Sequence, residues 1–360
     1  MNEGAWRGAR VLVTGHTGFK GGWLALMLSE LGAEVHGYAL DAPTQPSFFA
    51  ECRMRRLLAS HTVADVRDGD KLRATVAAAR PGIVFHLAAQ PLVRRSYLEP
   101  AETFAANVMG TVNLLQACAE VPGVRAVVNV TSDKCYENRE RAEAYREEEA
   151  MGGFDPYSAS KGCAELATAA WRRSFLAPRG VQVASARAGN VIGGGDWAED
   201  RLVPDFLRAI DAGKELVLRA PAATRPWQHV LEPLTGYLAL AEGLLGAHGA
   251  GLACGWNFGP GPGEERTVQW VAERLCEGMP GARWSVDPAA AAQPHEAHLL
   301  ALDSAKARRE LGWRPRWDAA QAIRRTLDWH RAWRRGEDML GFSAAQLHEH
   351  AASGGAGGRP

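Results

Sequence analysis

The chain of 360 residues is long enough for one large domain with an added lobe, or for two closely joined domains. Its 41 lysines and arginines balance its 41 aspartates and glutamates, so no net charge attracts nucleic acid or an anionic membrane. No apolar run approaches the roughly 18 residues that a membrane span needs. The six cysteines form no CxxC pair and residues 1–10 carry no secretory signal, so we expect reduced thiols and a cytoplasmic location.

The first half of the chain alternates short β-branched runs with helical patterns, which predicts a parallel sheet with helices on both faces. The expected strands cover residues 10–14, 35–40, 62–66, 83–87, 127–131 and 181–186. Helical patterns follow the first strand and cover residues 72–79, 103–119 and 156–175. The predicted fold class is therefore α/β, a doubly wound parallel sheet of the Rossmann type.

After Ala188, glycines and prolines separate short elements, which predicts loops and helices added at the carboxyl edge of the sheet. We expect a sheet domain over residues 1–187 and a smaller C-terminal α/β lobe mainly over 188–345, an arrangement that allows the chain to cross back between them. Residues 351–360 are small and poor in apolar side chains, so we expect a flexible tail there.

A glycine-rich turn joins the first strand to an amphipathic helix. Gly15, Gly18 and Gly21 have the spacing GxxGxxG, which allows a tight turn, close approach of a pyrophosphate and close packing of the helix. This spacing resembles that of the short-chain dehydrogenase/reductase superfamily. Asp41 lies 20 residues past Gly21, where a carboxylate accepts hydrogen bonds from ribose hydroxyls and repels a 2′-phosphate. We therefore expect the sheet domain to bind NAD rather than NADP.

A second motif pairs the end of the fifth strand with the next long helix. Ser132 directly follows the strand, and Tyr157 and Lys161 lie four residues apart on one helical face. A lysine ammonium beside a phenol stabilises the phenolate, so we expect a lowered pKa for Tyr157 and proton removal from a hydroxyl near neutral pH. Ser132 is expected to hold the same hydroxyl oxygen.

Strings along nearly the whole chain resemble the extended short-chain dehydrogenases that act on nucleotide sugars. They are TGHTGFKG at 14–21, LAAQ at 87–90, NVMGT at 107–111, TSDK at 131–134, YSASK at 157–161 and RPWQHV at 225–230. Longer strings, NVTSDKCYEN at 129–138 and RAGNVIGGGDWAEDRLVPD at 187–205, resemble the branch of that family that dehydrates CDP-glucose. The resemblance implies a lyase that converts CDP-glucose to CDP-4-keto-6-deoxyglucose and water through transient reduction of NAD.

The resemblance also implies a role for each catalytic residue. Tyr157 takes the proton of the sugar 4-hydroxyl while a hydride passes from C4 to NAD+, and the new ketone acidifies C5. Asp133, protonated, donates to the departing 6-hydroxyl while a base near Lys134 takes the C5 proton, and the hydride then returns to C6. Similar dehydratases carry glutamate at the position of Lys134. Because lysine accepts a proton only when neutral, Lys134 stays open between base and electrostatic partner.

The resemblance further implies binding residues and an oligomer. The cofactor contacts expected are Gly15, Thr17, Gly18, Phe19, Gly21, Asp41, Asp65, Val66, Leu87, Ala88, Ala89, Gln90, Tyr157 and Lys161. Asn190 and Arg225 are expected to contact the nucleotide sugar, although Asn190 also fits a simple turn and Arg225 a structural ion pair. We expect a homodimer or homotetramer, because superfamily members commonly pair the helices equivalent to 103–119 and 157–175.

Other interpretations of the sequence stay open. A nucleotide-sugar 4-epimerase or reductase on the same fold is distinguished by whether water is lost and a 4-keto-6-deoxy sugar accumulates. A noncatalytic NAD-sensing protein has no need to keep Ser132, Tyr157 and Lys161 together. No metal site is expected, because His295 and His298 are three residues apart and the HExxH motif needs four.

Overall fold

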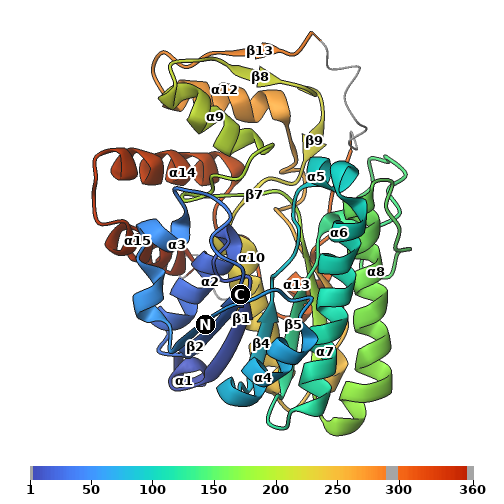
Figure 1. The fold of residues 1–360 in the computed structure, drawn as a ribbon. Coiled ribbons are helices and arrows are strands. Elements are labelled where there is room, and N and C mark those ends of the chain that lie inside the picture. The colour runs from blue at the N-terminus through green and yellow to red at the C-terminus, as the bar shows by residue number, and fades with distance from the viewer. Residues whose placement is uncertain (1–2, 289–298, 355–360) are drawn as a thin grey trace.

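The computed structural model of the chain describes residues 3–288 and 299–354. A seven-stranded parallel sheet forms its centre, in the order β11-β6-β5-β4-β1-β2-β3 (Figure 1). The strands are β1 (Arg10–Thr14), β2 (Glu34–Ala39), β3 (Ser60–Val63), β4 (Ile83–His86), β5 (Ala126–Val130), β6 (Gln182–Ala188) and β11 (Gly255–Phe258). The predicted α/β class and doubly wound sheet are confirmed. The strand order reverses between β1 and β4, the point at which such sheets bind ligands.

Helices cover both faces of the sheet because successive strand residues point to opposite sides. Val11 and Val13 belong to a core with one group of helices, whereas Leu12, between them, belongs to a second core. The first group contains α2 (Phe19–Glu30) and α10 (Leu231–Leu245), and the second contains α4 (Gly69–Ala79) and α7 (Gly110–Glu120), beside which α8 (Pro156–Trp171) packs. These side chains are fully buried, so the sheet is a rigid support for the residues at its carboxyl edge.

Several elements of the sheet domain differ from their predicted extents: the helix predicted over 156–175 ends at Trp171 and continues as a π-helical turn, and β6 extends two residues past the predicted strand over 181–186. The strand predicted over 62–66 ends at Val63, because the chain turns at Asp65, whose carboxylate accepts hydrogen bonds from the backbone and guanidinium of Arg67. The helix predicted over 103–119 is divided into α6 (Pro100–Phe104), a π-helical turn and α7. The wide turn carries Asn107, whose side chain reaches two other segments.

A smaller lobe lies beyond the carboxyl edge of the sheet (Figure 1). It contains α9 (Leu202–Asp211), α12 (Val268–Gly278) and the paired strands β8 (Leu216–Leu218) and β13 (Trp284–Val286). The lobe has its own core, which includes Phe206 and Leu275. Between these elements the chain crosses back to the sheet, because α10 packs on it and β11 pairs with β6. The chain therefore crosses the division predicted at residue 187, since α10 and β11 follow that residue in the sequence but belong to the sheet domain.

Short elements connect the larger ones. They are α1 (Glu3–Trp6), α3 (Phe48–Glu51), α5 (Val93–Leu98), α11 (Gly249–Leu252), α13 (Ala305–Glu310), β7 (Val191–Ile192), β9 (Thr224–Arg225), β10 (Gln228–His229) and β12 (Arg266–Thr267), with 3-10 turns at Met54–Leu57, Asp133–Cys135 and Ala177–Arg179 and π-helical turns at Ala105–Met109 and Arg172–Leu176. The turn at Asp133–Cys135 is the one that carries catalytic candidates.

Two C-terminal helices, α14 (Ala319–Arg334) and α15 (Met339–Ser353), pack together, and α15 also contacts α2. The flexible tail predicted from residue 351 is therefore wrong for residues 351–353, which end α15. Arg316 holds this end of the helix, because its guanidinium donates to the carbonyls of His350 and Ala351, each at 2.8 Å. Residues 355–360 lie outside the described part of the chain.

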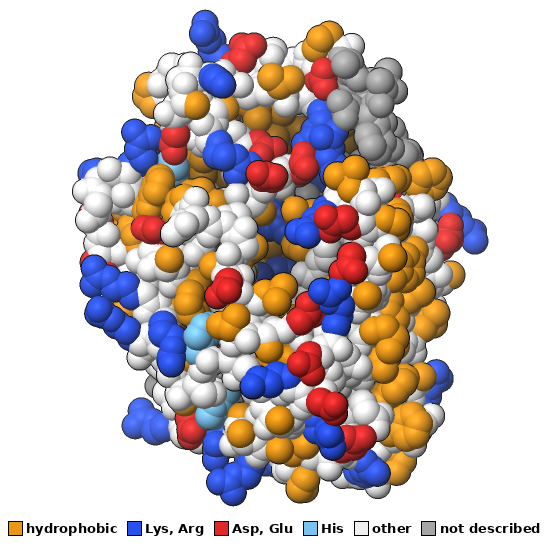
Figure 2. Space-filling model, in the orientation of Figure 1, with side chains coloured by type: hydrophobic (Ala, Val, Ile, Leu, Met, Phe, Trp, Pro, Cys, Tyr) orange, Lys and Arg blue, Asp and Glu red, His pale blue; other side chains and the backbone are white. Residues whose placement is uncertain are grey.

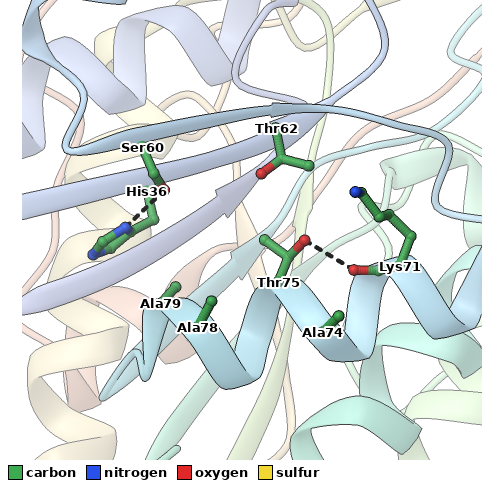
Figure 3. Close-up of a pocket in the computed structure, with 8 residues that line it drawn as sticks. All are labelled: His36, Ser60, Thr62, Lys71, Ala74, Thr75, Ala78 and Ala79. Carbon is green, nitrogen blue, oxygen red and sulfur yellow. Dashed lines mark hydrogen bonds between the residues drawn. The ribbon is translucent and has the colours of Figure 1, made fainter.

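A hollow of about 320 Å³ lies between α4 and strands β2 and β3 (Figure 3). His36 and Ser60 share a hydrogen bond in its wall, and Lys71 and Thr75 line its other side. None of the predicted site residues lines this hollow, which is therefore separate from the candidate site at the carboxyl edge of the sheet.

Candidate functional site

The glycine turn after β1 has the close packing that a dinucleotide site requires. Gly15 has a φ of +76°, and a Cβ there would lie 2.7 Å from the backbone nitrogen of Ala88. A Cβ on Gly21 would lie 2.1 Å from the carbonyl oxygen of Gly15. Gly18 is the N-cap of α2 and has no side chain, so no capping hydrogen bond occupies the amides of the first helical turn. The turn therefore fits a pyrophosphate, which binds to backbone amides at a helix N-terminus.

The adenosine end of the predicted NAD site follows β2 and β3. Thr17 donates its hydroxyl hydrogen to the Leu40 carbonyl at 2.8 Å, which ties the glycine turn to the residue before Asp41. Asp41 is exposed, so its carboxylate is accessible to a ribose. Asp65 accepts a hydrogen bond at its carbonyl from the Tyr38 hydroxyl at 2.6 Å, which fixes the loop after β3. The next residue in that loop, Val66, is buried.

The segment after β4 is held against the turn from the other side. The hydroxyl oxygen of Thr14 accepts from the backbone nitrogens of Leu87 and Ala88, each at 3.2 Å. Gln90 is fixed by Asn107, whose side chain accepts from the Gln90 backbone nitrogen at 2.8 Å. The segment 87–90 thus lies beside the glycine turn, with Ala88 and Ala89 leaving room for a ligand.

The catalytic candidates meet where β5 ends and α8 begins. Ser132 donates its hydroxyl hydrogen to Asp133 Oδ1 at 2.9 Å and also hydrogen-bonds with Tyr157. Lys161 Nζ lies 6.0 Å from the centre of the Tyr157 ring. All four side chains are buried, with at most 8% of any residue exposed. The structure therefore brings together Ser132, Asp133, Tyr157 and Lys161 in one enclosed group, with the half-buried Lys134 beside them.

The expected lowering of the Tyr157 pKa is wrong for this structure. Burial raises the pKa of Tyr157 to about 12, and the hydrogen bond with Ser132 only partly opposes the rise. Burial also lowers the pKa of Lys161 to about 8, so the charge meant to stabilise a phenolate is itself weakened. Desolvation thus outweighs the hydrogen bond with Ser132 and the positive charge of Arg201, which both lower the Tyr157 pKa.

The carboxyl of Asp133 differs in its pKa from that of an ordinary surface aspartate. Burial raises the pKa of its carboxyl, although the nearby positive charges of Lys134, Arg225 and Lys20 oppose this. Its second oxygen, Oδ2, is buried and has no hydrogen-bond partner within the described residues. A protonated carboxyl with an unpartnered oxygen is suited to donate a proton to a ligand, as the resemblance implies.

Arg225 and the backbone that precedes Asn190 both lie near Asp133. Arg225 is only 4% exposed, and its charge acts on Asp133. A Cβ on Gly189 would lie 3.2 Å from Asp133 Oδ2, which puts the backbone just before Asn190 against the same carboxyl. The Asn190 carbonyl accepts from the Gln228 nitrogen at 3.0 Å, which joins this segment to the one that follows Arg225. Figure 2 shows a hollow between the sheet domain and the lobe, with positively charged side chains inside it.

Sequence reasoning missed three polar residues of this site. Lys20 lies inside the glycine motif, and burial with neighbouring positive charges lowers its pKa to about 7. Arg201 acts electrostatically on Tyr157 and forms an ion pair with Asp196 at 2.9 Å. Asn107 donates to Ser160 Oγ at 2.9 Å, linking the segment 87–90 to α8. A charged residue inside a glycine-rich turn and the NVMGT string were the available signals.

No group of three or more histidine, cysteine, aspartate or glutamate side chains is placed to hold an ion within residues 3–288 and 299–354. His295 and His298 lie outside the described residues.

No helix in the described part of the chain is long and apolar enough to cross a membrane.

Comparisons with known proteins extend these observations. Residues 12–326 match the family model described as GDP-mannose 4,6 dehydratase. The chain is 52% identical over 356 residues to a CDP-glucose 4,6-dehydratase of Salmonella typhimurium, an alignment that covers 97% of this chain and 98% of the relative. It is 33% identical to a dTDP-glucose 4,6-dehydratase of Streptomyces antibioticus, over 69% of this chain and 70% of the relative.

Solved structures agree with this relationship. A dTDP-glucose 4,6-dehydratase from Streptomyces venezuelae, solved with NAD bound, has a TM-score of 0.75 and 26% identity, covering 92% of this chain and 99% of that one. A UDP-glucose-4-epimerase from Stenotrophomonas maltophila has a TM-score of 0.77 at 22% identity, covering 91% of this chain and 99% of that one, and supports the fold alone. The chain therefore belongs to the GDP-mannose 4,6-dehydratase family, enzymes on the extended short-chain dehydrogenase fold.

Proposed function

We propose that the protein is a lyase that converts CDP-glucose to CDP-4-keto-6-deoxyglucose and water. The observation that carries this proposal is Asp133, a buried carboxyl with a raised pKa and an unpartnered oxygen beside Ser132 and Tyr157. Transfer of a hydride to and from C4 needs no such acid, whereas loss of the 6-hydroxyl does. The choice of CDP-glucose as the substrate rests on the CDP-glucose 4,6-dehydratase of Salmonella typhimurium, which matches the chain over almost its whole length.

The residues of the chain divide the reaction between them. Ser132 and Tyr157 hold the sugar 4-hydroxyl, and Tyr157 takes its proton as C4 is oxidised. The glycine turn would hold NAD, which would supply an acceptor for the C4 hydride and the donor for its return to C6, and its positive ring charge would favour the Tyr157 phenolate. Asp133 donates its proton to the departing 6-hydroxyl, so that water leaves. Arg225 and Asn190 hold the nucleotide sugar against this group.

The base that removes the C5 proton stays open. Lys134 follows Asp133 directly, and its backbone nitrogen donates to the Ser132 hydroxyl oxygen at 3.2 Å, so its side chain starts at the mouth of the same site. It serves either as the base, when neutral, or as a positive charge that stabilises the enolate formed at the ketone. Removal of the C5 proton, departure of the 6-hydroxyl as water with the proton from Asp133, return of the hydride to C6 and return of a proton to C5 together leave the sugar with no net oxidation.

The test is a comparison of CDP-, dTDP-, GDP- and UDP-glucose with the purified protein and NAD. We expect 4-keto-6-deoxy product from CDP-glucose, with one water lost for each sugar, and at least about tenfold slower reaction with the others, the discrimination that 1.4 kcal/mol provides. Formation of the 4-epimer without loss of water would instead establish the epimerase alternative. Binding of NAD without conversion of any of the four sugars would support a sensing protein.

We also propose a homodimer or homotetramer. Exposed apolar side chains gather along α5, α6, α8 and the π-helical turns that follow α6 and α8, near the right-hand edge of Figure 2. They are Leu98, Phe104, Met109, Leu166 and Phe175. Contiguous exposed apolar surface of this kind supports association between copies of the chain. A cytoplasmic location stays a prediction.

A further inference from the structure

We propose that Arg187 and Tyr136 are positioning residues that hold the turn carrying Asp133 in register with α8. The inference rests on the proposed function, because it concerns the acid that releases water from C6. It assigns a role to a buried ionic network behind the site, none of whose side chains is among the catalytic or binding residues described above.

The centre of the network is a buried ion pair between Arg187 on β6 and Glu165 on α8. Arg187 Nε and Nη2 each donate to a Glu165 carboxylate oxygen at 2.9 Å, in a fork that matches the two oxygens. The two side chains are 5% and 6% exposed. Glu165 lies one helical turn after Lys161, so the pair fixes the part of α8 that carries the catalytic lysine.

Glu165 also binds the residue after β5 and a residue in the middle of β6. Thr131 and Ser185 each donate a hydroxyl hydrogen to its carboxylate at 2.6 Å. Thr131 directly precedes Ser132, so this bond fixes the start of the catalytic turn. The Glu165 carboxylate therefore accepts four hydrogen bonds, and these bonds together with the Arg187 charge keep its pKa below its ordinary value despite burial.

The third guanidinium nitrogen connects the ion pair to the other end of that turn. Arg187 Nη1 donates to the Tyr136 hydroxyl oxygen at 2.7 Å and to the Glu147 carbonyl at 2.9 Å. The Tyr136 hydroxyl then donates to Asn257 Oδ1 at 2.7 Å. The Arg187 guanidinium lies 5.0 Å from the centre of the Tyr136 ring. Tyr136 directly follows the 3-10 turn Asp133–Cys135.

The turn that carries Asp133 is thus bound at both ends to one guanidinium–carboxylate pair, through Thr131 before it and Tyr136 after it. The same pair is anchored on α8 beside Lys161. Misplacement by about 1 Å of a group that transfers a proton costs on the order of a hundredfold in rate. A rigid link between the acid and the helix that binds the same sugar is therefore a direct way to keep Asp133 aligned with the 6-hydroxyl.

Tyr136→Phe tests the link with the smallest change. It removes one hydroxyl but leaves the ion pair, the ring over Arg187 and the stacking of that ring on Tyr145, whose centre is 5.2 Å away. The matched control is Tyr145→Phe, which removes a hydroxyl from the same ring stack, where it bonds Arg139 and Asn138 and does not touch Arg187.

In single-turnover reactions with CDP-glucose, we expect Tyr136→Phe to oxidise C4 at nearly the wild-type rate but to release water about tenfold more slowly. Enzyme-bound NADH should then accumulate, which its absorbance reports, while the control shows no such accumulation. The melting temperature of both variants should stay within about 4 °C of the wild type, since each loses one or two hydrogen bonds. Equal slowing of both steps, or no slowing, overturns the inference.

Two further measurements keep the inference testable if Tyr136→Phe folds poorly. Arg187→Lys retains a positive charge opposite Glu165 but loses the Nη1 group that donates to Tyr136, and it should show the same accumulation of NADH. In an Asp133→Asn background, Tyr136→Phe should add less than about twofold to the loss, because the two act through one proton transfer. Additive losses overturn the inference. A wild-type protein that makes no 4-keto-6-deoxy product refutes the proposed function itself.

Discussion

At the scale of single residues, the site is controlled by how burial acts on charge. Burial favours the protonated form of both Asp133 and Tyr157, since it raises the pKa of each. For Asp133, this is the state that a general acid needs. For Tyr157, it is the opposite of the state that a general base needs, so the base function depends on the electrostatic change that NAD+ brings. The two residues therefore make different predictions.

Tyr157→Phe should remove the group that accepts the 4-hydroxyl proton while preserving the ring that fills the site. We expect turnover to fall by 10²–10⁴-fold, the usual effect of losing a general base. The affinity for NAD should change by less than about threefold, because the glycine turn is untouched. Stopped-flow measurement of NADH formation and calorimetry of NAD binding check the two parts. Turnover within about tenfold of the wild type would contradict the assignment.

Asp133→Asn should separate oxidation from elimination, because the amide keeps the size of the carboxyl but has no proton to give. Bound NADH should form at nearly the normal rate, whereas 4-keto-6-deoxy product should appear at least about a hundredfold more slowly. Single-turnover absorbance and product analysis measure both steps. Product at the wild-type rate shows that Asp133 is not the acid, and equal loss of both steps assigns it to positioning or to the oxidation.

The pH dependence of elimination should report the same carboxyl. Asp133 acts in its protonated form, and burial places its pKa above the ordinary aspartate value. The rate of water loss should therefore be highest below that raised pKa and fall as the pH increases through it. The falling limb should be absent in Asp133→Asn. A rate of water loss that rises with pH over this range would contradict a protonated Asp133.

At the scale of elements, the first strand, its turn and α2 form one unit whose geometry depends on the absence of side chains. An added methyl on Gly21 would overlap the Gly15 carbonyl oxygen at 2.1 Å, and the atoms nearest to it all belong to the backbone. The turn has no flexible group that can move aside. The cofactor site and the packing of α2 on the sheet are therefore coupled.

Gly21→Ala should consequently weaken NAD binding by at least about tenfold and destabilise the fold by about 1–3 kcal/mol, the usual cost of overpacking. Gly82→Ala is the control, because its added methyl has no atom within 4 Å. Calorimetry of NAD binding and urea unfolding measure the two effects. Wild-type NAD affinity in Gly21→Ala would mean that the turn opens without disturbing the site.

At the scale of the whole molecule, the apolar surface along α8 predicts how copies associate. Leu166 is 62% exposed there, whereas Val217, on β8 of the smaller lobe, is 51% exposed. Leu166→Glu should convert the dimer to a monomer, because it places charge in an apolar interface, and Val217→Glu should leave the dimer intact. Light scattering coupled to size-exclusion chromatography distinguishes the outcomes. A monomeric wild type, or a dimeric Leu166→Glu, contradicts the proposed interface.

The sequence by itself determined the parts of the protein that depend on neighbouring residues. Strand periodicity, the GxxGxxG spacing and the four-residue interval from Tyr157 to Lys161 all report local geometry, and the structure has the sheet, turn and helix that they predict. The quoted strings also identified the family, which the comparisons confirm.

The tertiary structure decided what depends on distant segments and on burial. β11 joins the sheet from the second half of the chain. Its partner β6 is some 70 residues away and its own run is only four residues long, so no local pattern predicts this pairing. The pKa of Tyr157 rises because the surrounding elements exclude water, a property that no interval between residues encodes. Arg187 reaches Glu165 and Tyr136 only after β6, α8 and the turn after β5 meet. Local spacing predicts which groups can share a site, whereas packing sets their protonation and alignment.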